Sequence, residues 1–281
     1  MASGILYVDK PAGMTSRALD NAIQKRFSTR KVGHLGTLDP FATGLLLVAV
    51  EKGTKSLAYL QDGKKTYQAE LVLGKKTSTG DPEGEVIEEK EIPTLSKEKV
   101  KEALSSFLGE SYQLPPMTSA IKVDGVALYE LAHKGKEIER EKRKIYIHDI
   151  RLLKLEGNVL YFEATVSSGT YIRVLGEDIA EKLGTVGYLK SLRRTSVGDI
   201  SIENAIPLEE ISEADFHDPS EAIDLRKVEI QSEAMLKDIQ NGKKMPLHSK
   251  EDKILFTHHG EAFAVYKKEK EGLYAAERGL F

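Results

Sequence analysis

The sequence contains no cysteine among its 281 residues. This absence excludes disulfide bonds, thiolate metal ligands and a cysteine nucleophile, and it fits a reducing compartment. The longest uninterrupted apolar run, Leu45–Val50, is far shorter than the roughly 20 residues that span a bilayer. Asp9 and Lys10 interrupt the apolar start of the chain, so we expect no secretory leader and no membrane anchor. We expect the protein to be located in the cytoplasm.

Several familiar catalytic motifs are also missing. The segment Gly74–Thr77 resembles the end of a phosphate-binding P-loop, but Ala69 stands where that motif requires its first glycine. The histidines do not have the spacing of a zinc site, and no G-x-S-x-G nucleophile elbow occurs. We therefore expect no metal and no cofactor, and any chemistry must use ordinary side chains.

The net charge of −3 hides a strong asymmetry along the chain. Residues 10–76 contain twelve Lys and Arg against five Asp and Glu, a net charge of +7. Residues 199–240 contain three against twelve, a net charge of −9. A protein with a basic face and an acidic back would bind a polyanion in one orientation. The alternative is that these charges are scattered over solvated faces.

The segment 32–44 concentrates unusual residues between a basic cluster and an apolar strand. Its three glycines allow backbone angles and close approaches that a side chain would forbid, and Pro40 fixes the chain just after Asp39. The strand that follows, Leu45–Val50, should be buried on both faces. Two interpretations stay open at this point. The loop either presents Asp39 for function or uses it only to accept bonds from backbone amides.

Apolar periodicity predicts strands and helices that do not alternate regularly. Strands are expected at 4–8, 45–50, 65–73, 144–155, 159–166 and 192–197, and helices at 16–27, 54–60, 127–134, 171–183 and after Ser96. We predict an α+β fold with a mixed, largely antiparallel sheet and flanking helices. We also predict a large domain, 1–227, and a small C-terminal domain, 228–281, beyond an acidic connector.

The central loop, GHLGTLDPFATG, resembles the catalytic motif of the bacterial tRNA pseudouridine-55 synthases, the TruB family. Five further segments match that family in the order expected for it: GILYVDKPAGMTS, KKTYQAELVLG, PPMTSAIKVDGVALYELAHKG, SSGTYIRVLGEDIAEKLG and YLKSLRRTSVG. The resemblance is strong from Gly4 to Gly198 and weak beyond. It implies the pseudouridine synthase fold and, for the C-terminal part, a small RNA-binding domain of the PUA type.

The resemblance implies catalytic roles for three residues. Asp39 corresponds to the family's nucleophile, and Arg173 to the arginine that pairs with it. An ion pair favours the ionised carboxylate, which is the reactive form. Tyr67 corresponds to a tyrosine that packs on the target base and assists proton removal. A core tyrosine and a surface ion pair are the ordinary alternatives for Tyr67 and Arg173.

The resemblance also implies residues that bind the substrate. Tyr171 and Leu192 correspond to positions that line the pocket for the flipped base. His34 corresponds to a histidine that contacts the RNA and holds the loop, and its alternative is a bond to its own backbone. Residues 117–145 resemble an RNA-gripping insertion. Candidate contacts with the RNA backbone are Lys10, Arg30, Lys31, Lys64, Lys122 and Arg143, with Lys134, Lys136, Arg140, Lys142 and Lys144 also in the insertion.

The resemblance thus implies an enzyme that isomerises uridine 55 in the T-loop of tRNA by base flipping, without a cofactor. The expected partner is the T-arm of tRNA, and we expect a monomer. The first alternative is a non-catalytic RNA-binding protein, such as a tRNA folding chaperone on the same scaffold. The second is a related synthase that modifies another RNA. Whether Asp39 attacks the ribose or the pyrimidine ring does not follow from the sequence.

Overall fold

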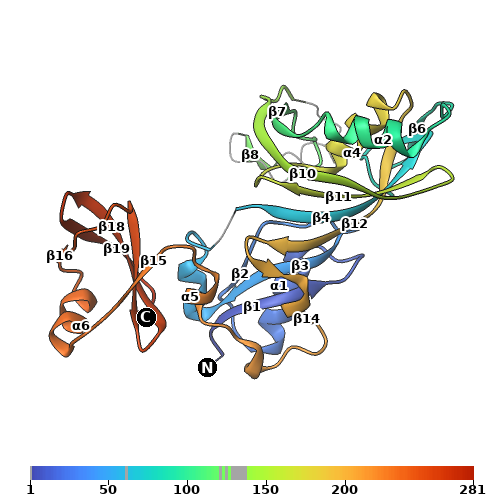
Figure 1. The fold of residues 1–281 in the computed structure, drawn as a ribbon. Helices are drawn as coiled ribbons and strands as arrows, with labels where there is room; N and C mark the ends of the chain where they lie inside the picture. The colour runs from blue at the N-terminus through green and yellow to red at the C-terminus, as the bar shows by residue number, and fades with distance from the viewer. Residues whose placement is uncertain (1, 61–62, 120–121, 124–125, 128–137) are drawn as a thin grey trace.

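The structure is a computed structural model that describes residues 2–60, 63–119, 122–123, 126–127 and 138–281. A 10-stranded sheet forms the main body, and a separate 5-stranded sheet forms the C-terminal part (Figure 1). The large sheet contains β1 (Gly4–Lys10), β2 (Val32–Leu35), β3 (Thr43–Val50), β4 (Lys65–Leu73), β7 (Gly109–Gln113), β10 (Arg143–Glu156), β11 (Val159–Val166), β12 (Gly187–Val197), β13 (Ile200–Ser201) and β14 (Ile206–Pro207).

The large sheet is mixed and largely antiparallel, which confirms the predicted fold class. Its strands follow the order β14-β1-β3-β12-β4-β11-β10-β7, with β2 paired to β3 and β13 paired to β12. The pairs β1–β14 and β3–β12 are parallel, and the other pairs are antiparallel. Strands β4 and β12 therefore lie near the middle of the sheet, where side chains from both halves of the molecule can meet.

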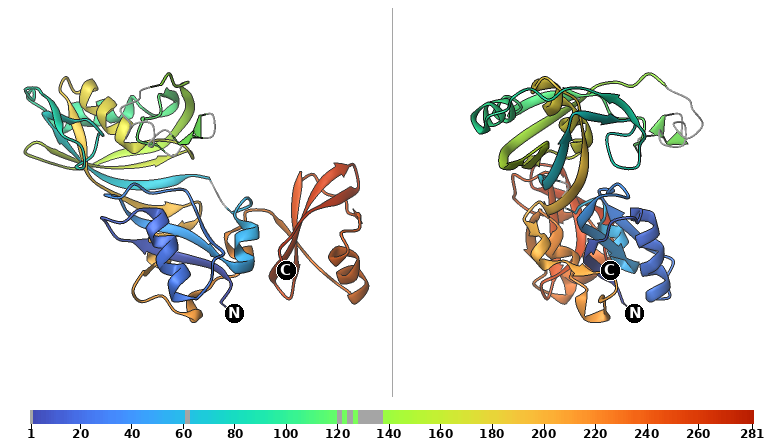
Figure 2. Two further views of the ribbon diagram at one scale, coloured as in Figure 1. Left: turned by 180° about the vertical axis from the view of Figure 1, so that it is seen from behind. Right: turned by 90° about the vertical axis from the view of Figure 1, so that its right-hand side faces the viewer.

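Helices cover the two halves of the large sheet separately. The helices are α1 (Ser16–Arg26), α2 (Lys97–Ser105), α4 (Ile172–Lys182), α5 (Pro219–Ala222) and α6 (Glu233–Gln240), with 3₁₀ turns η1 (Glu51–Ser56), η2 (Ile202–Asn204) and η3 (Glu213–Asp215). Helix α1 packs on the half that contains β1, β2 and β3, whereas α2 and α4 pack on the half that contains β10, β11 and β12 (Figures 1 and 2). Thr15, Ser96 and Ser232 cap α1, α2 and α6 through their side chains.

Strand β3 is buried on both faces, as its apolar run predicted. Leu46, Val48 and Val50 pack with α1, whereas Leu45, Leu47 and Ala49 belong to a second core cluster on the opposite face. All six side chains are 0% exposed. Because β3 is fixed on both sides, the loop that precedes it is anchored at a rigid point.

The C-terminal sheet packs beside the β1 and α5 end of the main body (Figure 1). It contains β15 (Arg226–Glu229), β16 (Met245–Pro246), β17 (Lys253–His258), β18 (Glu261–Lys270) and β19 (Leu273–Gly279). Leu255, Val265 and Leu280 share a core cluster with Leu60 and Ile223 of the main body. The burial of these apolar side chains holds the two parts together.

One predicted helix does not form, and another lies almost entirely outside the described residues. Residues 54–60 do not form an α-helix, because the 3₁₀ turn η1 (Glu51–Ser56) follows β3 directly and then passes into turns. A Cβ at Gly53 would lie 2.2 Å from the backbone oxygen of Gly4, so this close approach to β1 sets the local conformation.

The helix predicted at 127–134 lies outside the described residues except for Ala127. This residue ends β9 (Val126–Ala127), which pairs with β8 (Lys122–Val123) in a short hairpin. A second hairpin pairs β5 (Lys75–Thr77) with β6 (Val86–Glu89).

The contact between β3 and β12 gives a test of this fold. Gly44 has φ +105, and a Cβ there would lie 2.3 Å from the backbone oxygen of Arg194. Gly13 also has a positive φ, +76, but a Cβ there would meet nothing within 4 Å. We expect Gly13→Ala to lower the free energy of unfolding by about 1–2 kcal/mol. Gly44→Ala should cost about 3 kcal/mol or more in urea unfolding, because backbone must also move. Equal losses would contradict the close approach of the two strands.

Candidate active site

The loop between β2 and β3 carries Asp39, and the Lys10 side chain holds this loop in place. Its ammonium group donates hydrogen bonds to the carbonyl oxygens of Pro11 at 2.8 Å, Pro40 at 3.3 Å and Ala42 at 2.8 Å. Lys10 is 0% exposed, and burial lowers its pKa to about 8. The prediction that Lys10 contacts the RNA backbone is therefore wrong, because its donors already bind the loop and no surface is left for a phosphate.

A second anchor lies on the other side of Asp39. The hydroxyl of Ser16, at the start of α1, donates to the Leu38 carbonyl at 3.1 Å and accepts from the Leu38 amide at 2.9 Å. The Gly13 amide also donates to the Pro40 carbonyl at 2.9 Å. The turn after β1 and the start of α1 thus fix the backbone on both sides of Asp39. The position of this carboxylate is set by the main body and not by the loop alone.

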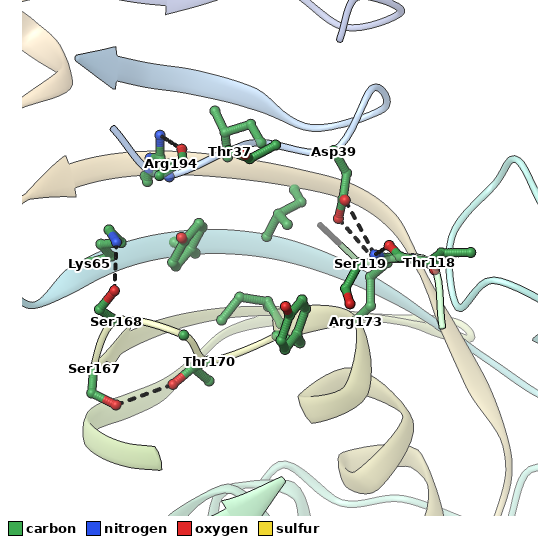
Figure 3. Close-up of a pocket in the computed structure, with 17 residues that line it drawn as sticks. Thr37, Asp39, Lys65, Thr118, Ser119, Ser167, Ser168, Thr170, Arg173 and Arg194 are labelled. Carbon is green, nitrogen blue, oxygen red and sulfur yellow. Dashed lines mark hydrogen bonds and ion pairs between the residues drawn. The ribbon is translucent and has the colours of Figure 1, made fainter. Parts of the chain in front are cut away.

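Arg173 brings its guanidinium to the Asp39 carboxylate in a two-point pair. Nε lies 2.9 Å from Oδ2, and Nη2 donates to Oδ1 at 3.2 Å. Arg173 comes from the first turn of α4, and its side chain is 4% exposed, whereas that of Asp39 is 32% exposed. The planar fork therefore fixes the orientation of the carboxylate, while one side of Asp39 stays open to the pocket (Figure 3).

The same guanidinium also binds a second carboxylate, which the sequence analysis missed. Nη1 lies 3.2 Å from Asp81 Oδ2, and the Asp81 side chain is 4% exposed. Nη1 also donates to the Thr79 carbonyl at 2.9 Å and to the Thr118 hydroxyl at 2.7 Å, and Nη2 donates to the Thr118 carbonyl at 2.9 Å. Asp81 follows the β5 strand in a turn that the sequence marked only by Pro82 and Gly84. Turn residues give no periodic signal that would place them at a site.

Burial and neighbouring charges act in opposite directions on Asp39. Desolvation raises the pKa of its carboxyl, the largest single effect, and the charge of Asp81 raises it further. The charge and hydrogen bond of Arg173 and the charge of Lys10 lower it, but the net pKa is above the usual value. The ion pair expected from the sequence favours the ionised form, and the desolvation seen in the structure opposes it.

Asp39 and Arg173 lie at one end of a pocket of about 350 Å³. Tyr67 on β4 and Leu192 on β12 line it, with exposures of 7% and 5%, and Tyr171 lines it just before α4. Gln113 on β7 holds the Tyr171 backbone by accepting from its amide at 2.7 Å and donating to its carbonyl at 3.0 Å. Five of the predicted site residues therefore meet in one cavity: Asp39, Tyr67, Tyr171, Arg173 and Leu192.

His34 does not line this pocket but contacts a residue that does. Its Nδ1 lies 2.8 Å from Oδ2 of Asp20, and its Nε2 lies 3.3 Å from the hydroxyl of Thr37. Thr37 lines the pocket next to Asp39. Asp20 is 1% exposed on the buried side of α1, and no motif in the sequence marked it as a partner of His34. His34 therefore links α1 to the Asp39 loop.

The other candidate RNA contacts lie on the surface where the structure describes them. Arg30, Lys31, Lys64 and Arg143 are exposed, as are Lys142 and Lys144 in the insertion. Arg140 is only partly exposed, and its Nη1 donates to the Pro115 carbonyl at 2.8 Å. Lys122 belongs to β8, and its side chain lies outside the described residues, as do Lys134 and Lys136.

Neither a metal site nor a membrane span is found in the part of the chain that the structure describes. No group of three or more His, Asp or Glu side chains in these ranges could hold a metal ion. None of the helices there is long and apolar enough to cross a bilayer.

Two family models match consecutive parts of the chain. The family model described as the TruB family pseudouridylate synthase N-terminal domain matches residues 24–172. The chain belongs to the TruB family of pseudouridylate synthases. A second model, the tRNA pseudouridylate synthase B C-terminal domain, matches residues 173–237. The two TruB matches meet between Ile172 and Arg173, so Asp39 lies in the first and its partner Arg173 begins the second.

Curated relatives and solved structures extend the TruB comparison. A tRNA pseudouridine synthase B of Alkaliphilus oremlandii is 45% identical over 209 residues, 74% of this chain and 70% of that protein. The Geobacter sulfurreducens protein of the same name is 42% identical over 210 residues, 75% of this chain and 69% of its own. A chain in a crystal structure of a Cbf5-Nop10-Gar1 complex superposes with a TM-score of 0.77 at 25% identity, covering 100% of this chain and 85% of that one.

The double pairing of Arg173 predicts how Asp39 responds to the loss of Asp81. Asp81→Asn keeps the side-chain shape and removes a negative charge that raises the Asp39 pKa. We expect ¹³C NMR titration of aspartate-labelled protein to place the Asp39 midpoint above the ordinary range in the wild type and lower in Asp81→Asn. An unchanged or higher midpoint in the variant would contradict the electrostatic coupling. Asp215→Asn, a change on an exposed turn of η3, serves as the control and should leave the Asp39 midpoint unmoved.

Proposed function

We propose that this protein isomerises a uridine of tRNA to pseudouridine, and that its target is uridine 55 in the T-loop. The observation that carries the proposal is the Asp39–Arg173 pair at the end of a pocket with aromatic and apolar walls, in a chain of the TruB family. Relatives named tRNA pseudouridine synthase B, 42–46% identical over most of the chain, support tRNA as the substrate. A simple RNA-binding module gains nothing from a carboxylate that faces a phosphate-rich ligand.

The reaction suits this set of side chains. It breaks the C1′–N1 bond of uridine, turns the base and forms a C1′–C5 bond. A proton leaves C5 and a proton is gained at N1, so the product is an isomer and no oxidant or group donor is needed. The Asp39 carboxylate acts as a covalent nucleophile and divides a difficult exchange into two easier steps. Attack at the ribose C1′ and attack at the pyrimidine C6 are both compatible with this balance.

The pocket suits a base that has left its stack. Its volume of about 350 Å³ is within the range of small-ligand sites, which suits a single nucleotide. Tyr67, Tyr171 and Leu192 provide surfaces that replace the stacking lost on flipping. Arg173 keeps Asp39 oriented, and Tyr67 packs on the base and assists removal of the C5 proton. His34 holds the loop through Thr37 and contacts the RNA.

We propose that the T-arm of tRNA lies across the basic face that includes Arg30, Lys31, Lys64 and Arg143, which are exposed. The insertion at 117–145 grips the RNA, and the small C-terminal domain, divided from the catalytic domain near residue 227, adds a PUA-like RNA contact. The protein acts as a monomer in the cytoplasm.

The direct test of the proposed chemistry replaces only the nucleophile. Asp39→Asn keeps the shape of the side chain and removes its charge. We expect the variant to bind a tRNA transcript within a few-fold of the wild-type Kd and to form no detectable pseudouridine, whereas the wild type forms one per tRNA. Turnover by Asp39→Asn near the wild-type rate would refute the catalytic assignment. Binding without product by the wild type itself would favour an RNA-binding protein or chaperone.

Tyr67 permits a test that separates its ring from its hydroxyl. Tyr67→Phe keeps the ring, whereas Tyr67→Leu removes both. If the hydroxyl assists proton transfer, Tyr67→Phe should be slower by about 10²–10⁴-fold in single-turnover assays, because general acid–base catalysis contributes that much. Tyr67→Leu should be at least as slow. Near-wild-type rates for Tyr67→Phe with slow turnover by Tyr67→Leu would leave the ring only as a wall of the pocket.

A further inference from the structure

The end of the pocket away from Asp39 is built from buried cations. Lys65 on β4 and Arg194 on β12 both line the pocket and are only 6% and 1% exposed. The Lys65 ammonium donates to the hydroxyl of Ser168 at 3.1 Å, and Ser168 also lines the cavity. Figure 3 places these three residues together, opposite the Asp39–Arg173 pair. The pocket therefore has the Asp39 carboxylate at one end and two cationic side chains at the other.

Arg194 makes bonds that leave its charge without a carboxylate. Its Nε donates to the Leu45 carbonyl at 2.7 Å, and its Nη2 donates to the Gly36 carbonyl at 2.8 Å. Within the described residues, Arg194 has no ion pair, and its Nη1 makes no hydrogen bond. A buried cation is costly unless an anion joins it. This guanidinium is thus held ready for an anion that the free protein does not supply.

The two cationic groups converge on one point of the pocket wall. A Cβ at Gly36 would lie 3.3 Å from Arg194 Nη1 and 3.3 Å from Lys65 Nζ. Gly36 has φ +70 and carries no side chain that would cover these nitrogens. Because both nitrogens lie so near the same point, a single tetrahedral anion can contact both of them. Lysine and arginine donors are the usual partners of phosphate oxygens.

The strand register places these cations in line with the walls of the base pocket. Lys65 and Tyr67 are two residues apart on β4, and Leu192 and Arg194 are two residues apart on β12, so each pair shares one face of its strand. Tyr67 and Arg194 face each other directly in the β4–β12 ladder. On β4, Lys65 therefore precedes the stacking residue Tyr67 by about 7 Å along the strand. A nucleotide has the same arrangement, with a flat base and a charged group joined by the sugar.

We propose that Lys65 and Arg194 form a phosphate subsite that binds the phosphodiester next to the flipped uridine. This inference rests on the proposed function, because it needs a nucleotide in the pocket. A phosphate at this end and Asp39 at the other give the nucleotide one orientation, since the carboxylate repels the phosphate. The base is thereby directed toward Asp39 and the backbone toward Lys65. The subsite also holds the RNA strand while the base is detached from its sugar and turns.

The test removes one charge from the RNA and one from the protein. T-arm RNAs carry a neutral methylphosphonate at the linkage 5′ or 3′ of the target uridine, or two linkages away as a control. Truncating one partner of a buried charge pair costs about 2–5 kcal/mol, so one of the two adjacent positions should weaken wild-type Kd by about 30-fold or more. The same neutral linkage should weaken binding to Lys65→Gln by a clearly smaller factor than it weakens wild-type binding, because only Arg194 then still faces the phosphate.

Lys154→Gln provides the matched control, since Lys154 is exposed on β10 and pairs with Glu156 away from the pocket. Lys154→Gln should lose as much affinity as the wild type when the adjacent linkage is neutral. A wild-type Kd that is unchanged by a neutral group at either adjacent linkage would overturn the subsite. A loss of affinity in Lys65→Gln as large as the wild-type loss would also overturn it. The wild-type measurement stands by itself if Lys65→Gln folds poorly. The coupling between the Lys65 charge and the phosphate charge is measured from Kd. Pseudouridine is measured separately in the same samples. Absence of product therefore contradicts the proposed function, and absence of coupling contradicts the subsite.

Discussion

The site depends on one guanidinium shared between two carboxylates. Arg173 binds Asp39 at two points and Asp81 at a third, with Thr118 completing its hydrogen bonds. These partners come from the β2–β3 loop, the β5–β6 hairpin and the segment that follows Pro116, so the interaction joins parts of the chain that are far apart in sequence. Removing either carboxylate would leave a largely buried cation with half of its compensation. This one interaction therefore holds three distant segments together and also orients the Asp39 carboxylate.

Burial and neighbouring charges act on the Asp39 carboxyl in opposite directions. Desolvation raises its pKa, whereas the charges of Arg173 and of the loop anchor Lys10 lower it. Lys10 acts through the backbone, because its ammonium group binds the Pro40 and Ala42 carbonyl oxygens directly after Asp39. The fixed loop, the guanidinium fork of Arg173 and the open side of Asp39 together present one carboxylate to the pocket.

Residue patterns predicted the fold well where they were periodic or apolar. The β4 strand has the predicted bounds, and β3 is buried on both faces. Patterns failed where tertiary contacts decide. The stretch 54–60 became the end of a 3₁₀ turn and further turns because Gly53 must approach Gly4, and Lys10 looked like a surface cation although it is buried. Asp81 gave no sign of its role, since a turn aspartate has many ordinary uses and only the fold brings it to Arg173.

The proposed target of the pocket at Asp39 is one uridine of the T-loop. The decisive measurement maps pseudouridine at nucleotide resolution along a complete tRNA transcript after incubation with the pure protein. We expect modification at position 55 alone, present with the wild type and absent with Asp39→Asn. Pseudouridine at scattered positions, or none anywhere in a correctly folded tRNA, would contradict it.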